Sequence, residues 1–109
     1  MRLPPALAAS ATPRILELLG EPAGRVLELG FAGIHAAPLR LAGFDVVVVE
    51  PDPAYLDRAR ERAGDALAAA PTEHFDAVVA PADADLGGIE TDRVVLVGQD
   101  GTAWSSTSS

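Results

Sequence analysis

The sequence contains no cysteine and no lysine, and its aromatic residues number only three Phe, one Tyr and one Trp. The lack of cysteine excludes disulfides, thiolate catalysis and cysteine-ligated zinc from this sequence. With so few aromatic rings, a core has to be built from Ala, Leu and Val, the usual filling of a small parallel sheet covered by helices. Hydrophobic residues make up 49% of the 109 residues, which provides enough apolar surface for one domain with its own core.

Positive charge is also scarce. Eight arginines stand against sixteen acidic residues, and the net charge is −8. Nucleic acids and anionic membranes attract proteins through clusters of cations, so neither is expected as a partner. The two histidines lie far apart in the sequence, which gives a histidine-based metal site little support.

Long hydrophobic runs are missing as well. Pro4, Pro5 and Pro13 interrupt the N-terminal apolar residues, which lack the hydrophobic core of a secretory signal. No stretch reaches the length of a membrane span. We therefore expect a cytoplasmic protein.

The order of apolar runs and turn residues predicts alternating helices and strands. Helices are predicted over about 5–20, with a cap at Thr12, and over 36–42 and 54–63; strands are predicted over 26–30, 45–50, 75–80 and 93–97. This alternation predicts an α/β fold with a minimal doubly wound, Rossmann-like parallel sheet of about four to five strands flanked by helices. The domain is predicted to span 1–98, and the polar residues 99–109 to form a flexible tail.

The most informative stretch runs from Val26 to His35 and reads Val-Leu-Glu-Leu-Gly-Phe-Ala-Gly-Ile-His. Gly30 permits a sharp turn from strand to helix, and Gly33 lets the backbone approach a ligand closely. The helix behind the loop offers free N–H groups. Glu50, at the end of the next strand, suits the two hydroxyls of a ribose.

This stretch resembles motif I of class I S-adenosylmethionine-dependent methyltransferases, written as an acid, any residue and then Gly-x-Gly-x-Gly. Segments 46–60, 75–80 and 93–98 are similar to later strands and helices of that family, so the resemblance covers roughly residues 10–98. It implies that S-adenosylmethionine is the cofactor. The residues that it implies for cofactor binding are Glu28, Gly30, Phe31, Ala32, Gly33, Glu50, Pro51 and Asp65. A dinucleotide-binding dehydrogenase would also use a glycine-rich turn, but an acid placed like Glu28, inside the first strand, is typical of methyltransferases.

The sequence departs from the family pattern in three places. Ala32 replaces the middle glycine, which adds a methyl group and disfavours a positive φ there. No third strand is evident, so Asp65 either contacts adenine or belongs to a helix extended over 64–70. The family's C-terminal antiparallel hairpin is lacking, which would leave the strand at 93–97 uncovered. A homodimer, a partner protein, or a short strand of the tail anchored by Trp104 would cover that edge.

These features predict a small methyltransferase-like protein that transfers a methyl group to a small molecule or a peptide. His35 and Asp83 are the candidate catalytic residues, with a solvated surface residue as the alternative reading of each. The second hypothesis is a catalytically degenerate relative that serves as a binding or scaffolding partner of a biosynthetic enzyme. A nicotinamide-dependent oxidoreductase ranks third, because the chain has no second domain to hold a hydride acceptor.

Overall fold

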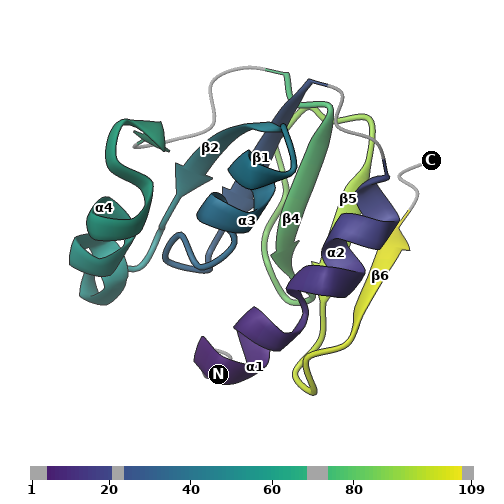
Figure 1. Ribbon diagram of the computed structural model, residues 1–109, viewed down its shortest axis with the longest axis horizontal. Helices are drawn as coiled ribbons and strands as arrows, with labels where there is room; N and C mark the ends of the chain where they lie inside the picture. Colours follow the sequence, from purple (N-terminus) through teal and green to yellow (C-terminus); the bar gives the residue numbers. More distant parts are fainter. Residues whose placement is uncertain (1–4, 21–23, 69–73, 107–109) are drawn as a thin grey trace.

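The computed structural model describes residues 5–20, 24–68 and 74–106, which form a six-stranded sheet with helices packed against it (Figure 1). The strands are β1 (Arg25–Leu29), β2 (Asp45–Val49), β3 (Leu67–Ala68), β4 (Ala77–Pro81), β5 (Val94–Val97) and β6 (Ala103–Ser106). The helices are α1 (Pro5–Ser10), α2 (Thr12–Leu19), α3 (Ala36–Leu41) and α4 (Leu56–Ala63), with 3-10 turns η1 (Pro53–Tyr55) and η2 (Gly64–Ala66).

The sheet has the order β3-β2-β1-β4-β5-β6, and its first five strands run parallel. Only β6 is antiparallel, and it pairs with β5. The α/β class and the mostly parallel, Rossmann-like sheet expected from the sequence are therefore confirmed. The four strands predicted from apolar runs are β1, β2, β4 and β5, with boundaries that differ by one or two residues.

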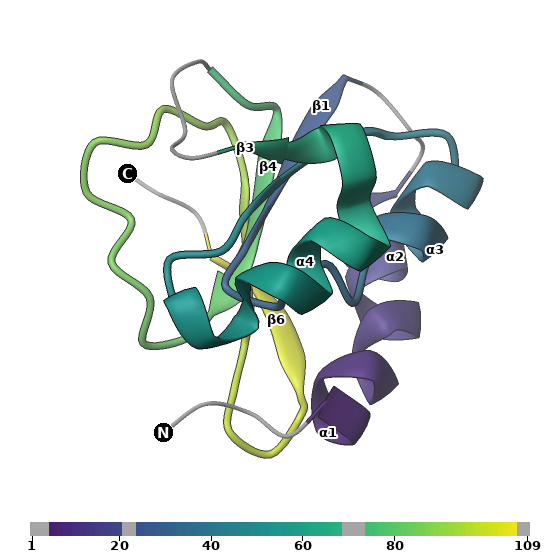
Figure 2. The ribbon, with the colours of Figure 1, turned by 90° about the vertical axis from the view of Figure 1, so that its left-hand side faces the viewer.

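The two faces of the sheet are covered differently. One face packs against residues from all four α-helices, among them Ile15, Leu39 and Ala63. Among the described residues, the apolar cluster on the opposite face contains no helical residue; the connection between β4 and β5 covers it through Ala84, Leu86 and Ile89 (Figure 2). A right-handed crossover from β4 to β5 has to pass over this second face, and here it does so as a loop.

The N-terminal helix expected over 5–20 is divided into α1 and α2 at Ala11. Thr12 was expected to cap this helix, but the N-cap residue of α2 is Ala11 and Thr12 is the first helical residue. The Thr12 hydroxyl instead lies 2.8 Å from Nδ1 of His35. A tertiary hydrogen bond has therefore replaced a local one.

Two predictions at the sheet edges were wrong. The third strand that the sequence did not reveal is present as β3, which pairs with β2 through Leu67 and Ala68. The predicted tail does not lie wholly outside the domain, because residues 103–106 form β6 and cover β5; residues 107–109 lie outside the described part. A strand formed by the tail was one of the three expected ways to cover the strand at 93–97. Because β6 covers that strand, the uncovered edge on which the homodimer expectation was based is absent.

The strand order also locates the end of the sheet at which a crevice is expected. From β1 the chain moves outward to β2 and β3, and it then returns to the other side of β1 as β4. Adjacent connections diverge at this reversal, which opens a crevice beyond the carboxyl ends of β1 and β4. None of the helices in the described ranges has the length and apolar character needed to cross a membrane.

Candidate functional site

A cavity of about 390 Å³ lies at this reversal, beyond the carboxyl ends of β1, β2, β4 and β5. Its size is in the range of pockets that hold small ligands. Its apolar wall consists of Ala8, Leu29, Gly30, Phe31, Ala32, Ile34, Pro51, Tyr55, Pro81 and Ala84. Its polar wall consists of Asp52, Arg58, Arg62, Asp83, Asp85 and Gln99.

The turn from β1 into α3 has an unusual backbone. Gly30, Ala32 and Gly33 have φ angles of +82°, +52° and +78°. Ala32 was expected to disfavour a positive φ, but it adopts one, at a cost of about 1–2 kcal/mol for an L-residue. Ala32 thus has a left-handed conformation at the position where the family pattern has a glycine, which would adopt it without strain.

Glu50 holds Ala32 in this conformation. Its Oε1 accepts a hydrogen bond from the Ala32 N–H at 2.8 Å, and its Oε2 accepts one from the Asp52 N–H at 2.9 Å. Only 5% of Glu50 is exposed. The predicted ribose-binding acid therefore binds the protein's own backbone, and it connects the glycine loop to the end of β2.

Glu28 has a similar internal role on β1. It is fully buried, and its Oε2 accepts a hydrogen bond from the His35 N–H at 2.8 Å. Its Oε1 has no hydrogen-bond partner among the described residues. Burial raises the pKa of Glu28 from 4.5 to about 7, while the backbone N–H groups of His35 and Gly33 and the charge of Arg62 oppose this shift. Glu28 is not part of the cavity wall.

His35 is also sealed behind the loop. Its ring is fully buried and packs edge-on against Phe31, with ring centroids 4.9 Å apart. Nδ1 faces the Thr12 hydroxyl, and Nε2 has no hydrogen-bond partner within the described ranges. Burial lowers the pKa of His35 from 6.5 to about 4, so the ring is neutral at pH 7. As a candidate catalytic base, His35 is shielded from the cavity.

The other predicted residues divide into two groups. Gly30, Phe31, Ala32, Pro51 and the candidate catalytic residue Asp83 lie on the cavity wall, where the sequence placed them. Asp65 is exposed in η2, and neither Asp65 nor Gly33 lines the cavity.

The cavity also contains polar residues that the sequence did not single out. Asp52 is the acid at the end of β2 that faces the cavity, and the signal for it was its position two residues after Glu50. Arg58 and Arg62 are four residues apart on α4, a spacing that places two side chains on one face of a helix.

The charged residues of the cavity wall come from different elements. Asp83 and Asp85 follow β4, while Arg58 and Arg62 come from α4. Arg62 is partly fixed, because its Nη1 donates to the carbonyl of Ala32 at 3.1 Å. The arrangement can accept a ligand that carries both a cationic and an anionic group.

Comparison of the sequence with models of known protein families and with curated proteins gave no significant match.

Proposed function

We propose that the cavity beyond β1 and β4 binds S-adenosylmethionine, and that the protein transfers its methyl group to a small molecule or a peptide. The observation that carries this proposal is the position of a 390 Å³ cavity at the reversal of strand order, directly against the glycine loop. Ligands of open α/β sheets bind at this place.

The charges of the cavity are compatible with this cofactor. S-adenosylmethionine supplies a positively charged sulfonium, from which a methyl group is displaced by an in-line attack. Asp83 and Asp85 complement a positive charge, and Arg58 and Arg62 complement a carboxylate. Tyr55 and Ile34 provide apolar contact area for a heterocyclic base.

The roles of the two acids of the motif change in this proposal. Glu28 and Glu50 shape the loop from behind, and Asp52 is the residue at the end of β2 that would meet the ribose hydroxyls. Asp83 would lie beside the reacting centre, where it can orient the methyl acceptor or take up its proton.

Isothermal titration with S-adenosylmethionine and S-adenosylhomocysteine tests this function, because the two ligands differ by the methyl group and its positive charge. We expect both to bind the wild-type protein. Asp83→Asn should weaken S-adenosylmethionine by about tenfold and S-adenosylhomocysteine less. Asp52→Asn should weaken both. Asp57→Asn is the matched control, because that carboxylate is exposed on α4 and does not line the cavity.

A second candidate function is a catalytically degenerate binding or scaffolding partner of another enzyme. The observation that favours it is that both motif carboxylates bind the protein's own backbone and neither lines the cavity. Failure of both ligands to bind at millimolar concentration would reject the methyltransferase proposal and leave this second function.

A further inference from the structure

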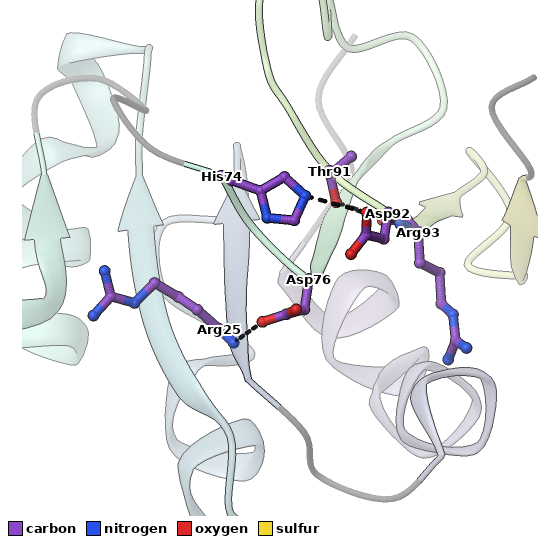
Figure 3. Close-up of polar contacts among 6 residues, drawn as sticks. All are labelled: Arg25, His74, Asp76, Thr91, Asp92 and Arg93. Carbon is purple, nitrogen blue, oxygen red and sulfur yellow. Dashed lines mark hydrogen bonds and ion pairs between the residues drawn. The ribbon is translucent and has the colours of Figure 1, made fainter.

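A second group of functional side chains, with potential metal-ligand atoms, lies at the amino-terminal ends of the strands, opposite the cavity (Figure 3). His74 and Asp76 precede β4, and Asp92 precedes β5. Each of the three residues offers one potential ligand atom, a ring nitrogen of His74 and a carboxylate oxygen of each aspartate. These three atoms lie within 4.8 Å of one another. All three residues are exposed.

The backbone brings these three side chains together. Phe75 pairs with Thr91 in parallel register, its N–H donates to the Glu90 carbonyl at 2.9 Å, and its carbonyl accepts from the Asp92 N–H at 3.3 Å. Phe75 is fully buried. Side chains alternate along an extended segment, so His74 and Asp76 both point away from the core.

Hydrogen bonds hold two of the side chains in place. Oδ2 of Asp76 accepts from the backbone N–H of Arg25 at 2.7 Å, and a Cβ at Gly24 would overlap this carboxylate. Nε2 of His74 lies 3.2 Å from Oδ1 of Asp92. The imidazole therefore already points its Nε2 toward a carboxylate oxygen.

Two of the three side chains border open space. Asp76 and Asp92, but not His74, line a hollow of about 270 Å³ whose other walls include Leu19 and Phe44, so there is room for water molecules beside the two carboxylates. Arg93 lines the same hollow, but its guanidinium donates to carbonyls at the end of α2, at 3.0 and 3.2 Å, and points away from Asp92 (Figure 3).

We propose that His74, Asp76 and Asp92 bind one divalent transition-metal ion, of which Zn²⁺ fits the donor set best. An imidazole nitrogen with two carboxylate oxygens suits Zn²⁺, whereas Mg²⁺ and Ca²⁺ prefer oxygen ligands alone. Zinc binds such atoms at about 2.0–2.2 Å in a tetrahedral arrangement, which places its ligand atoms about 3.4 Å apart. The three atoms lie within 4.8 Å of one another, so they have to approach by at most about 1.4 Å, which rotation of exposed side chains permits.

The proposed site uses only one histidine, His74. The sequence argument against a metal site assumed two histidines close together, so it does not apply to this site. The ion takes the place of the proton between His74 and Asp92, and water fills its remaining positions. It joins the segments that enter β4 and β5, and through Asp76 it is connected to the start of β1. The ion therefore has a structural role at the edge opposite the cavity.

Titration of the metal-stripped, full-length protein with ZnCl₂ tests this proposal, with a chain that carries no polyhistidine tag. We expect one ion per chain, and Co²⁺ in place of Zn²⁺ should give visible d–d absorption bands. His74→Ala and Asp92→Asn should each weaken zinc binding by about tenfold or more. Glu90→Gln is the matched control, because this neighbouring exposed acid is outside the cluster and should leave binding unchanged.

Two results would overturn the proposal. One is the absence of stoichiometric zinc binding at millimolar metal. The other is binding that survives both His74→Ala and Asp92→Asn, which would indicate diffuse attraction to the acidic surface. Circular dichroism of each variant shows whether it is folded, and the exposed positions predict that it is. Cofactor titration of the zinc-free protein keeps this result separate from the proposed methyltransferase function.

Discussion

Oε1 of Glu50 lies 2.8 Å from the backbone nitrogen of Ala32, the only non-glycine residue with a positive φ among the described residues. The second oxygen of Glu50 accepts from the Asp52 N–H. One buried carboxylate thus secures the strained turn after β1 and the chain leaving β2. The loop that faces the cavity is shaped from behind by a charge that the sequence alone had assigned to a ligand.

Glu50→Gln should destabilise the protein by about 1–3 kcal/mol, because an amide has one acceptor oxygen and leaves either the buried Ala32 N–H or the part-buried Asp52 N–H without this partner. Urea unfolding followed by circular dichroism measures this change. Glu17→Gln is the control, because Glu17 is an exposed residue of α2 in an ion pair with Arg14 and should change stability by less than about 0.5 kcal/mol. Equal stability of Glu50→Gln and wild type would contradict the anchoring role of this carboxylate.

Gly33→Ala should be more destabilising than Gly88→Ala. Both glycines have a positive φ, +78° and +82°, so both substitutions carry the left-handed backbone cost of about 1–2 kcal/mol. A Cβ at Gly33 would also lie 3.0 Å from Cβ of Arg62, whereas a Cβ at Gly88 would have nothing within 4 Å. The difference between the two unfolding free energies, expected to be about 1 kcal/mol or more, isolates this packing of the loop against α4. Identical losses would show that the loop can move away from α4 freely.

The pH dependence of stability should reveal two opposite contributions from the buried pair behind the loop. The folded pKa of Glu28, about 7, lies above its ordinary 4.5, so its contribution to stability is full below pH 4.5 and is lost as the pH rises to 7. The folded pKa of His35, about 4, lies below its ordinary 6.5, so its contribution is full above pH 6.5 and is lost as the pH falls to 4. Between pH 4.5 and 6.5 a rise in pH therefore lowers the contribution of Glu28 to stability and raises that of His35.

Single variants separate these contributions. Relative to wild type, Glu28→Gln should gain stability as the pH rises from 4.5 to 7, because it lacks the buried acid that ionises there. His35→Gln should gain stability, again relative to wild type, as the pH falls from 6.5 to 4. Each change should reach a few kcal/mol over its window. Urea midpoints measured from pH 4 to 8 check both signs, and differences from wild type that do not vary with pH would refute the assignment.

Removal of β6, by ending the chain at Thr102, should expose the edge of β5 and promote self-association. We expect a loss of about 2 kcal/mol or more in stability, together with a mass that rises with protein concentration in light scattering. The full-length chain, measured at the same concentrations, is the control. A truncated chain that remains monomeric and equally stable would mean that β6 contributes neither pairing nor protection.

The central strands could be predicted from the sequence; of the edge strands, β3 was not predicted, and β6 was expected only as one of three ways to cover β5. The valines of β2 form an uninterrupted apolar run, which is what a parallel strand buried on both faces requires. By contrast β3 has two residues, and β6 reads Ala-Trp-Ser-Ser. Such segments have no strand pattern of their own, and they become strands only through the hydrogen-bonding edge that a neighbour offers.

The candidate site was predicted in part. The resemblance to the methyltransferase motif indicated the loop with Gly30 and the residue Asp83 beyond β4, and both line the cavity. The sequence could not show that Asp52, and not Glu50, faces the cavity. In the structure Glu50 is buried and accepts two backbone N–H hydrogen bonds, and it therefore points away from the cavity.

The sequence by itself determined the α/β class and the order of the main elements, because hydrophobic periodicity and turn residues act locally. The tertiary structure alone decided that Ala32 adopts a left-handed φ and that Glu28 and Glu50 bind the backbone. It also decided that His74 and Asp92, 18 residues apart, meet at the opposite edge of the sheet. Each of these outcomes depends on contacts between segments distant in sequence, where the desolvation of a buried charge or the pairing of two strands outweighs local preference.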